Sequence, residues 1–492
     1  MPISIETFFL DSDAEGTLQA RIQQMVAQGI LAGRFRPGER LPSSRRMAQH
    51  LGVSRITVTL AYTELVADDY LTSKGRSGYF VSENAPEPPA FPAQQAPNST
   101  VDWGRVIGHK HLPAFNMDRP KDWASYKYPF IYGQTDPTLF DSANWRLCAL
   151  QALGKRDFSA MTADYYDRDD PKLIEFIARQ ILPRRGILAG PEEVLVTMGA
   201  QNALWLTAQV VLNARRRAAI EDPSYPALRT ILTQSSCQLS PVSVDKDGLP
   251  PEAIPDGTDV VFTTPSHHCP TACTMPLDRR KALLQKAEDD DFLIVEDDYE
   301  FEMSFLKAPS PSLKSLDQNG RVIYVGSFSK SLFPGLRLGY LVGPAPFIRE
   351  ARALRASILR HPPGQIQRTV AYYLSLGHYD ALVRRMSKAY EQRRMVIDQA
   401  IAENGLTVAG QGTFGGSSIW MKAAPHIDTH ELADILRAKG VLIEPGAPFF
   451  HSTNPPQNYF RVAYSSIPAS RISAGIGHIA DALRTLEEKG HA

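Results

Sequence analysis

The chain has 492 residues, and its 53 Lys and Arg side chains are balanced by 53 Asp and Glu. That length exceeds what a single hydrophobic core usually supports, so it predicts two or three domains. The zero net charge excludes a basic field over the whole molecule, and any contact with nucleic acid must come from a local patch. We expect no signal peptide and no membrane contact, because the first ten residues lack a basic segment and no stretch approaches the ~18 apolar residues of a membrane span.

The cysteines have neither zinc-finger spacing nor the density of a disulfide framework. We therefore expect reduced thiols in a cytoplasmic protein, and no metal site. The cysteines are Cys148, Cys237, Cys269 and Cys273.

Helical periodicity begins near the N-terminus, from Thr17 to Leu31, and Gly33 follows the last turn. The apolar residues on one face of this helix are Leu18, Ile22, Met25, Val26 and Ile30.

Two further helices and a hairpin are predicted before residue 85. Ser43 and Ser44 are candidate caps of a helix that runs through His50, and a glycine then makes a turn. Ser54 caps a third helix, which continues to about Asp68. Two short β-type runs, 70–72 and 79–81, flank a basic hairpin tip. This order of elements predicts a winged helix-turn-helix, an α+β unit that is mostly α.

Such a unit can place its third helix in the major groove, with the first residues of that helix toward the base edges. From Arg34 to Ser82 there are eight Lys and Arg against four Asp and Glu, a local excess within a neutral chain. The apolar residues of the third helix that we expect to face partly inward are Ile56, Val58, Leu60 and Leu65. The candidate DNA-binding residues are Arg45, Arg46, Ser54, Arg55, Thr57, Thr59, Lys74 and Arg76.

The pattern alone leaves two possibilities open, a DNA-binding unit or a small interaction module. The segment that begins at Pro37, PGERLPSSRRMAQHLGVSRITVTLAYTELVADDYL, closely resembles the winged helix of GntR-type bacterial regulators. The resemblance covers about residues 15–84 and implies operator DNA as a partner. Asp69 stands where these regulators usually have glycine, which we interpret as a variation of the turn.

A proline-rich segment follows, from Glu83 to Thr100. Proline fixes φ and removes an amide donor, so this segment cannot pack as a helix or a central strand. It predicts a semi-rigid, extended linker. We therefore divide the chain into a DNA-binding domain at 1–84, a linker at 85–122 and a large domain at 123–492. The prolines are Pro86, Pro88, Pro89, Pro92 and Pro97.

Beyond the linker, short apolar runs alternate with helical segments, which predicts an α/β domain with a largely parallel sheet. Ligands of such sheets bind at the carboxyl ends of the strands. Polar residues that suit a bound phosphorylated cofactor follow three of the runs. The clearest runs are Val194–Thr197, Val260–Thr263, Phe292–Val295 and Val322–Val325. The candidates are the backbone amides of Gly199 and Ala200 and the side chains of Asp297, Tyr299, Ser327, Lys330 and Arg337.

Each of these motifs is weak when taken alone, since an isolated lysine or an Asp-Asp pair is usually solvated. Together and in this order they resemble the fold-type-I aminotransferases, over about residues 125–488. The resemblance implies that pyridoxal 5'-phosphate (PLP) is held as a Schiff base on Lys330. Asp297 would then pair with the pyridine nitrogen, and Tyr299 would reach the phenolic oxygen.

The same resemblance implies roles for residues around the cofactor. The phosphate would be held by Ser327, Arg337 and the amides of Gly199 and Ala200. Tyr225 would stack on the ring or lie close to it, and Tyr166 would reach the phosphate of a partner subunit. Arg461, in the run YFRVAY, would bind the carboxylate of an amino-acid ligand, because its planar fork matches a carboxylate.

The combination of a GntR-type winged helix, a linker and an aminotransferase-like domain resembles the MocR/GabR family of bacterial regulators. The run YGQTDPTLF at 132–140 and the run Thr264–His267 are similar to segments of that family's large domain. The resemblance implies a cytoplasmic, PLP-dependent transcription regulator that forms a homodimer, either head-to-tail or domain-swapped. Its partners would be operator DNA and a small amine or amino-acid effector.

Two departures from the pattern matter for function. Cys269 stands where an aminotransferase normally has asparagine, which would hydrogen-bond the phenolic oxygen. This change leaves Tyr299 as the main donor and argues against efficient transamination. The run 167–170, Asp-Arg-Asp-Asp, lacks a usual glycine, and it would reshape the mouth of the pocket.

Three hypotheses follow from the sequence. The first is a regulator in which an effector amine displaces Lys330 by aldimine exchange while Arg461 holds its carboxylate, and closure changes the spacing of two winged helices. The second is a working aminotransferase with an appended DNA-binding head. The third is a DNA-binding protein whose large domain is only a scaffold. GABA, taurine, β-alanine, ectoine-derived amines and PLP itself all remain open as effectors.

Overall fold

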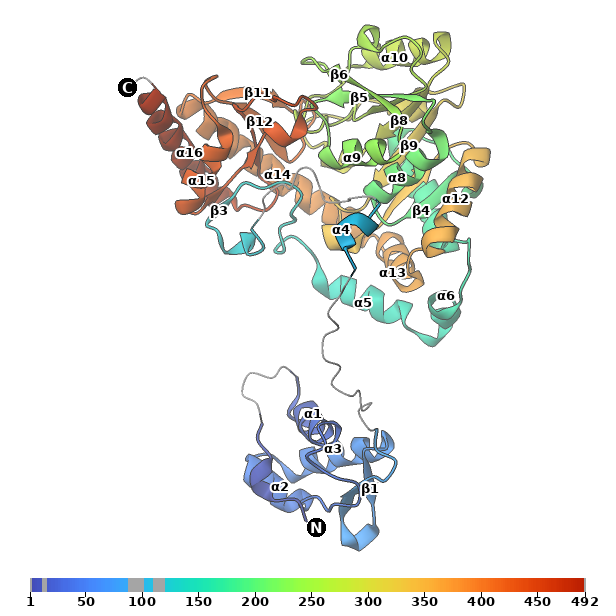
Figure 1. The fold of residues 1–492 in the computed structure, drawn as a ribbon, viewed down its shortest axis with the longest axis vertical. Helices are drawn as coiled ribbons and strands as arrows, with labels where there is room; N and C mark the ends of the chain where they lie inside the picture. Colours follow the sequence, from blue (N-terminus) through green and yellow to red (C-terminus); the bar gives the residue numbers. More distant parts are fainter. Residues whose placement is uncertain (1, 11–15, 87–100, 109–119, 491–492) are drawn as a thin grey trace. The chain divides into compact units, whose positions relative to one another are not determined.

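The computed structural model divides the chain into two compact units, Met1–Lys110 and His111–Ala492 (Figure 1). Each unit is described by itself. The proline-rich segment lies mostly outside the described residues, and a short helix, α4 (Trp103–Val106), lies within the predicted linker range 85–122. The domain boundaries given above therefore stay predictions. The structure describes residues 2–10, 16–86, 101–108 and 120–490.

The N-terminal unit contains the three predicted helices and the predicted hairpin. A serine or threonine caps each helix: the hydroxyls of Thr17, Ser43 and Ser54 accept hydrogen bonds from backbone amides in the first turns. Each such cap contributes about 1 kcal/mol to helix stability. The elements are α1 (Leu18–Leu31), α2 (Ser44–Leu51), α3 (Arg55–Ala67), β1 (Leu71–Ser73) and β2 (Tyr79–Val81). Asp69, in the turn before β1, adopts φ 59°, a left-handed conformation that glycine adopts without strain.

One face of α3 forms part of the core of this unit. Val58 and Leu65 are buried there, together with Ile22 of α1. The prediction that Ile56 and Leu60 face partly inward is wrong, because they are 72% and 48% exposed. At 100° per residue, these two side chains lie on the opposite side of the helix from the buried set. The expected apolar face of α1 also needs correction at one position, since Leu18 is largely exposed.

The C-terminal unit is built on a seven-stranded sheet with the order β4-β10-β9-β8-β7-β5-β6. The pairs β6-β5, β5-β7, β7-β8 and β8-β9 are parallel, whereas β10 is antiparallel to both of its neighbours. This confirms the predicted α/β class and the largely parallel sheet. The strands are β4 (Val194–Thr197), β5 (Arg217–Asp222), β6 (Gln238–Ser243), β7 (Val260–Thr263), β8 (Leu293–Asp297), β9 (Val322–Ser327) and β10 (Gly339–Val342).

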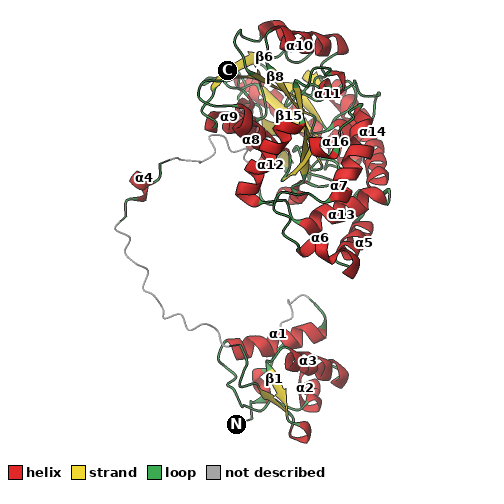
Figure 2. Ribbon diagram, turned by 90° about the vertical axis from the view of Figure 1, so that its right-hand side faces the viewer, coloured by secondary structure: helices red, strands yellow, loops and turns green. Residues whose placement is uncertain are grey.

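Helices cover both faces of this sheet (Figure 2). Residues of α8, α9 and α12 pack in one hydrophobic cluster with alternate residues of the strands. The other face packs against α10 and α11 near β5 to β8, and against α7, α13 and α14 near β4, β9 and β10. The helices are α7 (Pro171–Phe176), α8 (Ala200–Val211), α9 (Pro226–Gln234), α10 (Leu277–Asp289), α11 (Leu313–Leu316), α12 (Ala345–Leu359), α13 (Gly364–Ser375) and α14 (His378–Glu403).

A smaller antiparallel sheet, with the order β11-β12-β15-β14, completes the unit. Two-residue strands β3 and β13 pair in parallel beside it. The strands are β3 (Tyr128–Pro129), β11 (Thr407–Gln411), β12 (Ser418–Lys422), β13 (Val441–Leu442), β14 (Glu444–Pro445) and β15 (Tyr459–Ala463). The remaining helices are α5 (Ser142–Ala152), α6 (Phe158–Thr162), α15 (Thr429–Ala438) and α16 (Ala469–Gly490). Among the described residues, no helix is long and apolar enough to cross a membrane.

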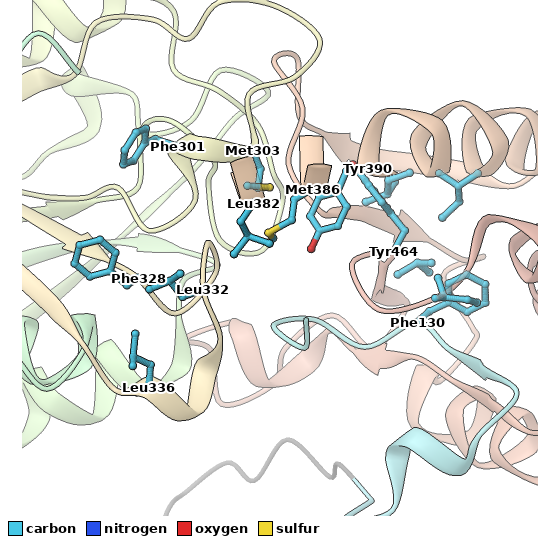
Figure 3. Packing of buried hydrophobic residues seen from close by; sticks show 14 of the residues in the cluster. Phe130, Phe301, Met303, Phe328, Leu332, Leu336, Leu382, Met386, Tyr390 and Tyr464 are labelled. Atoms are coloured by element: carbon cyan, nitrogen blue, oxygen red, sulfur yellow. The ribbon is translucent and has the colours of Figure 1, made fainter. Parts of the chain in front are cut away.

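One hydrophobic cluster joins the two sheets. Figure 3 shows Phe328 and Leu332 at one end of it, Leu382 and Met386 of α14 in the middle, and Tyr464 at the other end. Phe328 and Leu332 flank Lys330 in the chain, and Tyr464 follows the strand that carries Arg461. The close packing of this core therefore fixes where these two side chains lie relative to one another.

Candidate effector-binding site and DNA-binding face

A cavity of about 870 Å³ opens between the large sheet and the small sheet. It brings together eight of the predicted cofactor and effector residues, and Gly199 lies at its edge beside Arg337. The eight residues are Ala200, Tyr225, Asp297, Tyr299, Ser327, Lys330, Arg337 and Arg461. Further residues of its wall, for which the sequence assigned no role in binding, include Tyr132, Gly133, Trp205 and Phe449.

Lys330 follows β9 and projects into this cavity. Its Nζ lies 4.0 Å from the centre of the Tyr132 ring, within the range of a cation–π interaction. Gly133 is equally close: a Cβ on it would lie 2.6 Å from the same Nζ, and its φ is +81°. Any other residue at this position would therefore crowd the lysine, which explains the glycine in the run YGQTDPTLF.

Asp297 and Asp298 follow each other at the end of β8, but the structure gives them different surroundings. Asp298 accepts hydrogen bonds from Arg185 Nε at 2.6 Å and from Tyr324 at 2.9 Å. Asp297 lines the cavity, and its buried Oδ1 has no hydrogen-bond partner among the described residues. Of the two acids, Asp297 alone is thus placed to hold a polar group of a ligand, such as a protonated ring nitrogen.

The burial of Asp297 has a consequence for stability. Desolvation, followed by the negative charges of Asp298 and Glu221, raises the pKa of this carboxyl to about 7. Between the ordinary pKa of about 4 and this value, the folded protein retains a proton that the unfolded chain has released. The cofactor-free protein should therefore lose about 3 kcal/mol of unfolding free energy at this residue between pH 5 and pH 8.

The variant Asp297→Asn should lack this contribution. We expect urea unfolding of the cofactor-free variant to show a smaller loss of stability from pH 5 to pH 8 than the parent chain shows. Buried groups that do not interact with Asp297 titrate equally in both proteins, so the difference between the two profiles reports Asp297 and the groups coupled to it. Identical profiles would contradict the assignment of a raised pKa to this residue.

The region around Gly199 has the features of a phosphate site. Gly199 has φ 83° and precedes α8, so the first amides of this helix are free to bind an anion. Arg337 donates from Nη2 to the Met198 carbonyl at 3.5 Å, and a Cβ on Gly199 would lie 3.4 Å from that nitrogen. Ser327 lines the same part of the cavity. The residues present thus fit a phosphorylated ligand.

Tyr299 and Cys269 meet near the middle of the cavity wall. The Tyr299 hydroxyl donates to the His267 carbonyl at 2.8 Å. Burial raises the pKa of the Cys269 thiol to about 11, so this side chain is neutral at ordinary pH. The thiol accepts a weak contact from Arg461 Nη1 at 3.9 Å. Cys269 therefore offers the cavity only a soft, uncharged group.

Arg461, on β15, is buried and held on three sides. Its Nε donates to Glu444 Oε2 at 2.8 Å, and the strand register places these two residues opposite each other. Its guanidinium lies 4.2 Å from the ring centre of Tyr132 and 4.7 Å from that of Phe449. Since Glu444 occupies the Nε side, the Nη groups remain on the side of the cavity. Neither Glu444 nor Phe449 carried a sequence signal of its own.

Tyr132 contacts both cations of the site, Lys330 and Arg461. Its hydroxyl donates to Glu300 Oε2 at 3.2 Å, and Glu300 also accepts a hydrogen bond from Ser417. This ring is therefore fixed at its far end by a buried carboxylate. The sequence analysis named the run that begins with Tyr132 but gave this residue no role.

Tyr166 and the run 167–170 do not line the cavity. Asp169 forms an ion pair with Arg355 at 2.6 Å, and Asp170 caps α7. Asp169 and Asp170 are thus used in packing, and the expectation that this run reshapes the mouth of the pocket stays a prediction. Tyr166 is 56% exposed with φ 52°, and its predicted role in a partner subunit stays a prediction.

The predicted DNA-binding residues lie on α2, α3 and the hairpin. Arg45, Arg46 and Arg55 are exposed, whereas the Ser54 hydroxyl accepts the Thr57 amide and hydrogen-bonds to the Thr57 hydroxyl. The Thr59 hydroxyl donates to the backbone of Arg55. In the hairpin, Lys74 lies over the ring of Phe80. Arg76 lies in the turn Gly75–Ser77, and its side chain is outside the described part of the structure.

Comparison with known proteins identifies both units. Residues 18–81 match the gntR family of bacterial regulatory proteins, and residues 138–479 match aminotransferase class I and II. The HTH-type transcriptional regulator TauR of Rhodobacter capsulatus is 59% identical over 98% of this chain and 100% of its own. The probable rhizopine catabolism regulatory protein MocR of Rhizobium meliloti is 30% identical over 98% of this chain and 97% of its own. The chain belongs to the MocR family of transcriptional regulators.

Solved structures of aminotransferases resemble the large domain of this MocR-type chain. The α-aminoadipate aminotransferase LysN of Thermus thermophilus has a TM-score of 0.70 and 25% identity, covering 79% of this chain and all of its own. A kynurenine aminotransferase of Pyrococcus horikoshii has a TM-score of 0.67 and 27% identity, covering 74% and 93%. The C-terminal unit of this regulator therefore has the fold-type-I aminotransferase fold, as predicted.

Proposed function

We propose that this regulator binds PLP on Lys330 and senses an effector that carries both an amine and an acidic group. The observation that supports this most strongly is the single cavity shared by Lys330, Asp297 and Arg461. When bound, PLP supplies an electrophilic carbon that exchanges amines and a chromophore that reports the exchange. Asp297 would hold the proton on the ring nitrogen, and Ser327, Arg337 and the amides after Gly199 would hold the phosphate.

Arg461 would select the acidic end of the effector. Glu444 orients it through Nε, while Tyr132 and Phe449 restrict the guanidinium plane from the sides. The buried Glu444 also balances the positive charge of Arg461 while no ligand is bound. Recognition would then depend on paired hydrogen bonds from the Nη groups, which suits carboxylate or sulfonate oxygens.

Two residues of the cavity wall, Cys269 and Tyr299, favour the sensing of an amine over its catalytic conversion. At the position of Cys269 an aminotransferase normally has an asparagine donor, and here a neutral thiol occupies it. The hydroxyl of Tyr299 is shared with a backbone carbonyl. With these hydrogen-bond donors weakened, we expect the bound amine to stay on the cofactor rather than to be converted to a keto acid. The alternative, an aminotransferase with an appended DNA-binding head, predicts repeated keto-acid production instead.

One experiment separates these functions. The full chain is loaded with PLP and mixed with GABA, β-alanine, taurine or other amino acids, while absorbance, keto-acid release and operator affinity are followed together. We expect an absorbance change and altered operator affinity without multiple turnovers. Sustained keto-acid release in the presence of an acceptor would contradict the sensor, and no absorbance change with any amine would contradict PLP-dependent sensing.

The N-terminal unit would bind operator DNA, and the regulator would then act in the cytoplasm of a bacterial cell. The variant Arg45→Ala should weaken binding to every DNA sequence about equally, because we assign this exposed arginine to a phosphate. It should also reduce the slope of log affinity against log salt concentration by about 1. Fluorescence anisotropy over a salt series measures both quantities. A loss confined to one operator sequence would contradict a phosphate contact.

A homodimer is also part of the proposal. Four large apolar side chains on and next to α5 are 45–61% exposed, an arrangement typical of a surface that another subunit covers. Paired winged helices would also suit paired operator half-sites. The dimer could include exchange of the N-terminal units between subunits. The four side chains are Leu147, Leu150, Leu153 and Phe158.

A further inference from the structure

The outer face of α3 carries two exposed apolar side chains. Ile56 is 72% exposed and Leu60 is 48% exposed, one helical turn apart. The opposite face packs into the core through Val58 and Leu65, so neither exposed residue is needed for folding. Single exposed apolar side chains are ordinary on protein surfaces, so this pair draws its meaning from its place on α3, the helix that we propose enters the major groove.

The surroundings of this pair favour a contact with DNA. Arg55 is exposed at the start of the same helix, and Arg45 and Arg46 are exposed on α2. Apart from Glu64, the exposed charges on these two helices are thus positive and complement a polyanion rather than an apolar protein surface. The acidic residue of this helix closest to the pair in sequence, Glu64, is engaged by a hydrogen bond from Gln23 of α1.

The threonine hydroxyls of this face are poorly suited to donating hydrogen bonds to base edges. The hydroxyls of Thr59 and Thr63 donate to backbone carbonyls of Arg55 and Thr59, at 2.9 Å in each case. Their protons are therefore already used, so these two hydroxyls can only accept further hydrogen bonds, whereas Ile56 and Leu60 offer aliphatic groups alone. In the major groove the complementary feature is the C5-methyl group of thymine.

We propose that Ile56 and Leu60 read thymine methyl groups in the operator. This inference rests on the proposed DNA-binding function and adds to it a chemical rule for base selection. Four residues of an α-helix span about 6 Å, and successive bases are about 3.4 Å apart. The two side chains would then contact thymines about two base steps apart.

The test uses deoxyuridine, which lacks only the thymine methyl group. An operator is first selected with the full chain from random duplexes, and each thymine is then replaced singly by deoxyuridine. We expect two replacements, about two base steps apart, each to weaken binding about fourfold, as expected for one buried methyl group. In Ile56→Ala one of these effects should disappear, and in Leu60→Ala the other.

Two controls make the result specific. Leu18→Ala removes an equally exposed leucine from α1 and should keep both deoxyuridine effects. Arg45→Ala should weaken binding overall and also keep them. If the operator is bound but no replacement matters, or if the effects persist in Ile56→Ala and Leu60→Ala, the thymine proposal is wrong while DNA binding stands. If no operator can be selected at all, both proposals are wrong.

Discussion

The variant Lys330→Ala should lose every response to amines. Without this amine the cofactor cannot be held covalently, so the characteristic absorbance band should be absent, and added amino acids should no longer alter operator affinity. Operator binding itself should stay within about twofold of the parent chain, because the winged helix has its own core and its own caps. Absorbance spectra and anisotropy titrations with and without effector measure both properties.

The matched control is Lys307→Ala, since Lys307 is exposed and lies outside the cavity. It should behave like the parent chain in both measurements. If Lys330→Ala still changed its operator affinity with amines, the C-terminal unit would sense them by another route. If the parent chain itself showed no absorbance band, the large domain would be only a scaffold.

The second large effect is expected at Arg461. In Arg461→Met, affinity for an acid-bearing amine such as β-alanine should fall by about 100-fold or more, because a buried charged hydrogen-bond donor is lost. Propylamine, which has no acidic group, should be affected far less, so the preference for β-alanine over propylamine should almost vanish. Absorbance titrations of the cofactor-loaded variants give these affinities.

This substitution also breaks the buried ion pair between Arg461 and Glu444, which should destabilise the fold by about 3 kcal/mol. The double variant Glu444→Gln with Arg461→Met removes the other charge of that pair as well. It should regain much of the stability while still failing to prefer β-alanine. If the double variant recovered the preference as well, Arg461 would act only through the fold and not by direct contact with the effector.

Much of this architecture follows from local sequence rules. The three caps, the period-3.6 pattern of α1 and the short hairpin strands depend on neighbouring residues, so they could be predicted with nearly correct bounds. The same holds for β4, β7, β8 and β9, whose buried runs need no knowledge of their partners. Lys330 and Asp297 could be predicted because each comes directly after such a run.

Other features depend on residues that are distant in the chain. Glu444 and Phe449 join Arg461 only because β14 pairs with β15 and the following turn folds over it. Of two adjacent acids, the choice of Asp297 over Asp298 as the cavity residue follows from Arg185, which reaches Asp298 from 113 positions away. No local pattern predicts such contacts.

The sequence by itself determined the class of the molecule: a winged helix, a fold-type-I domain, and a lysine and an acid at two neighbouring strand ends. The tertiary structure decided which side chains are free to act. It turned Ile56 and Leu60 outward, because the core contacts of α3 come from its other face, and it placed Tyr132 between Lys330 and Arg461. Burial and long-range packing set these properties, since they depend on what surrounds a residue rather than on what precedes it.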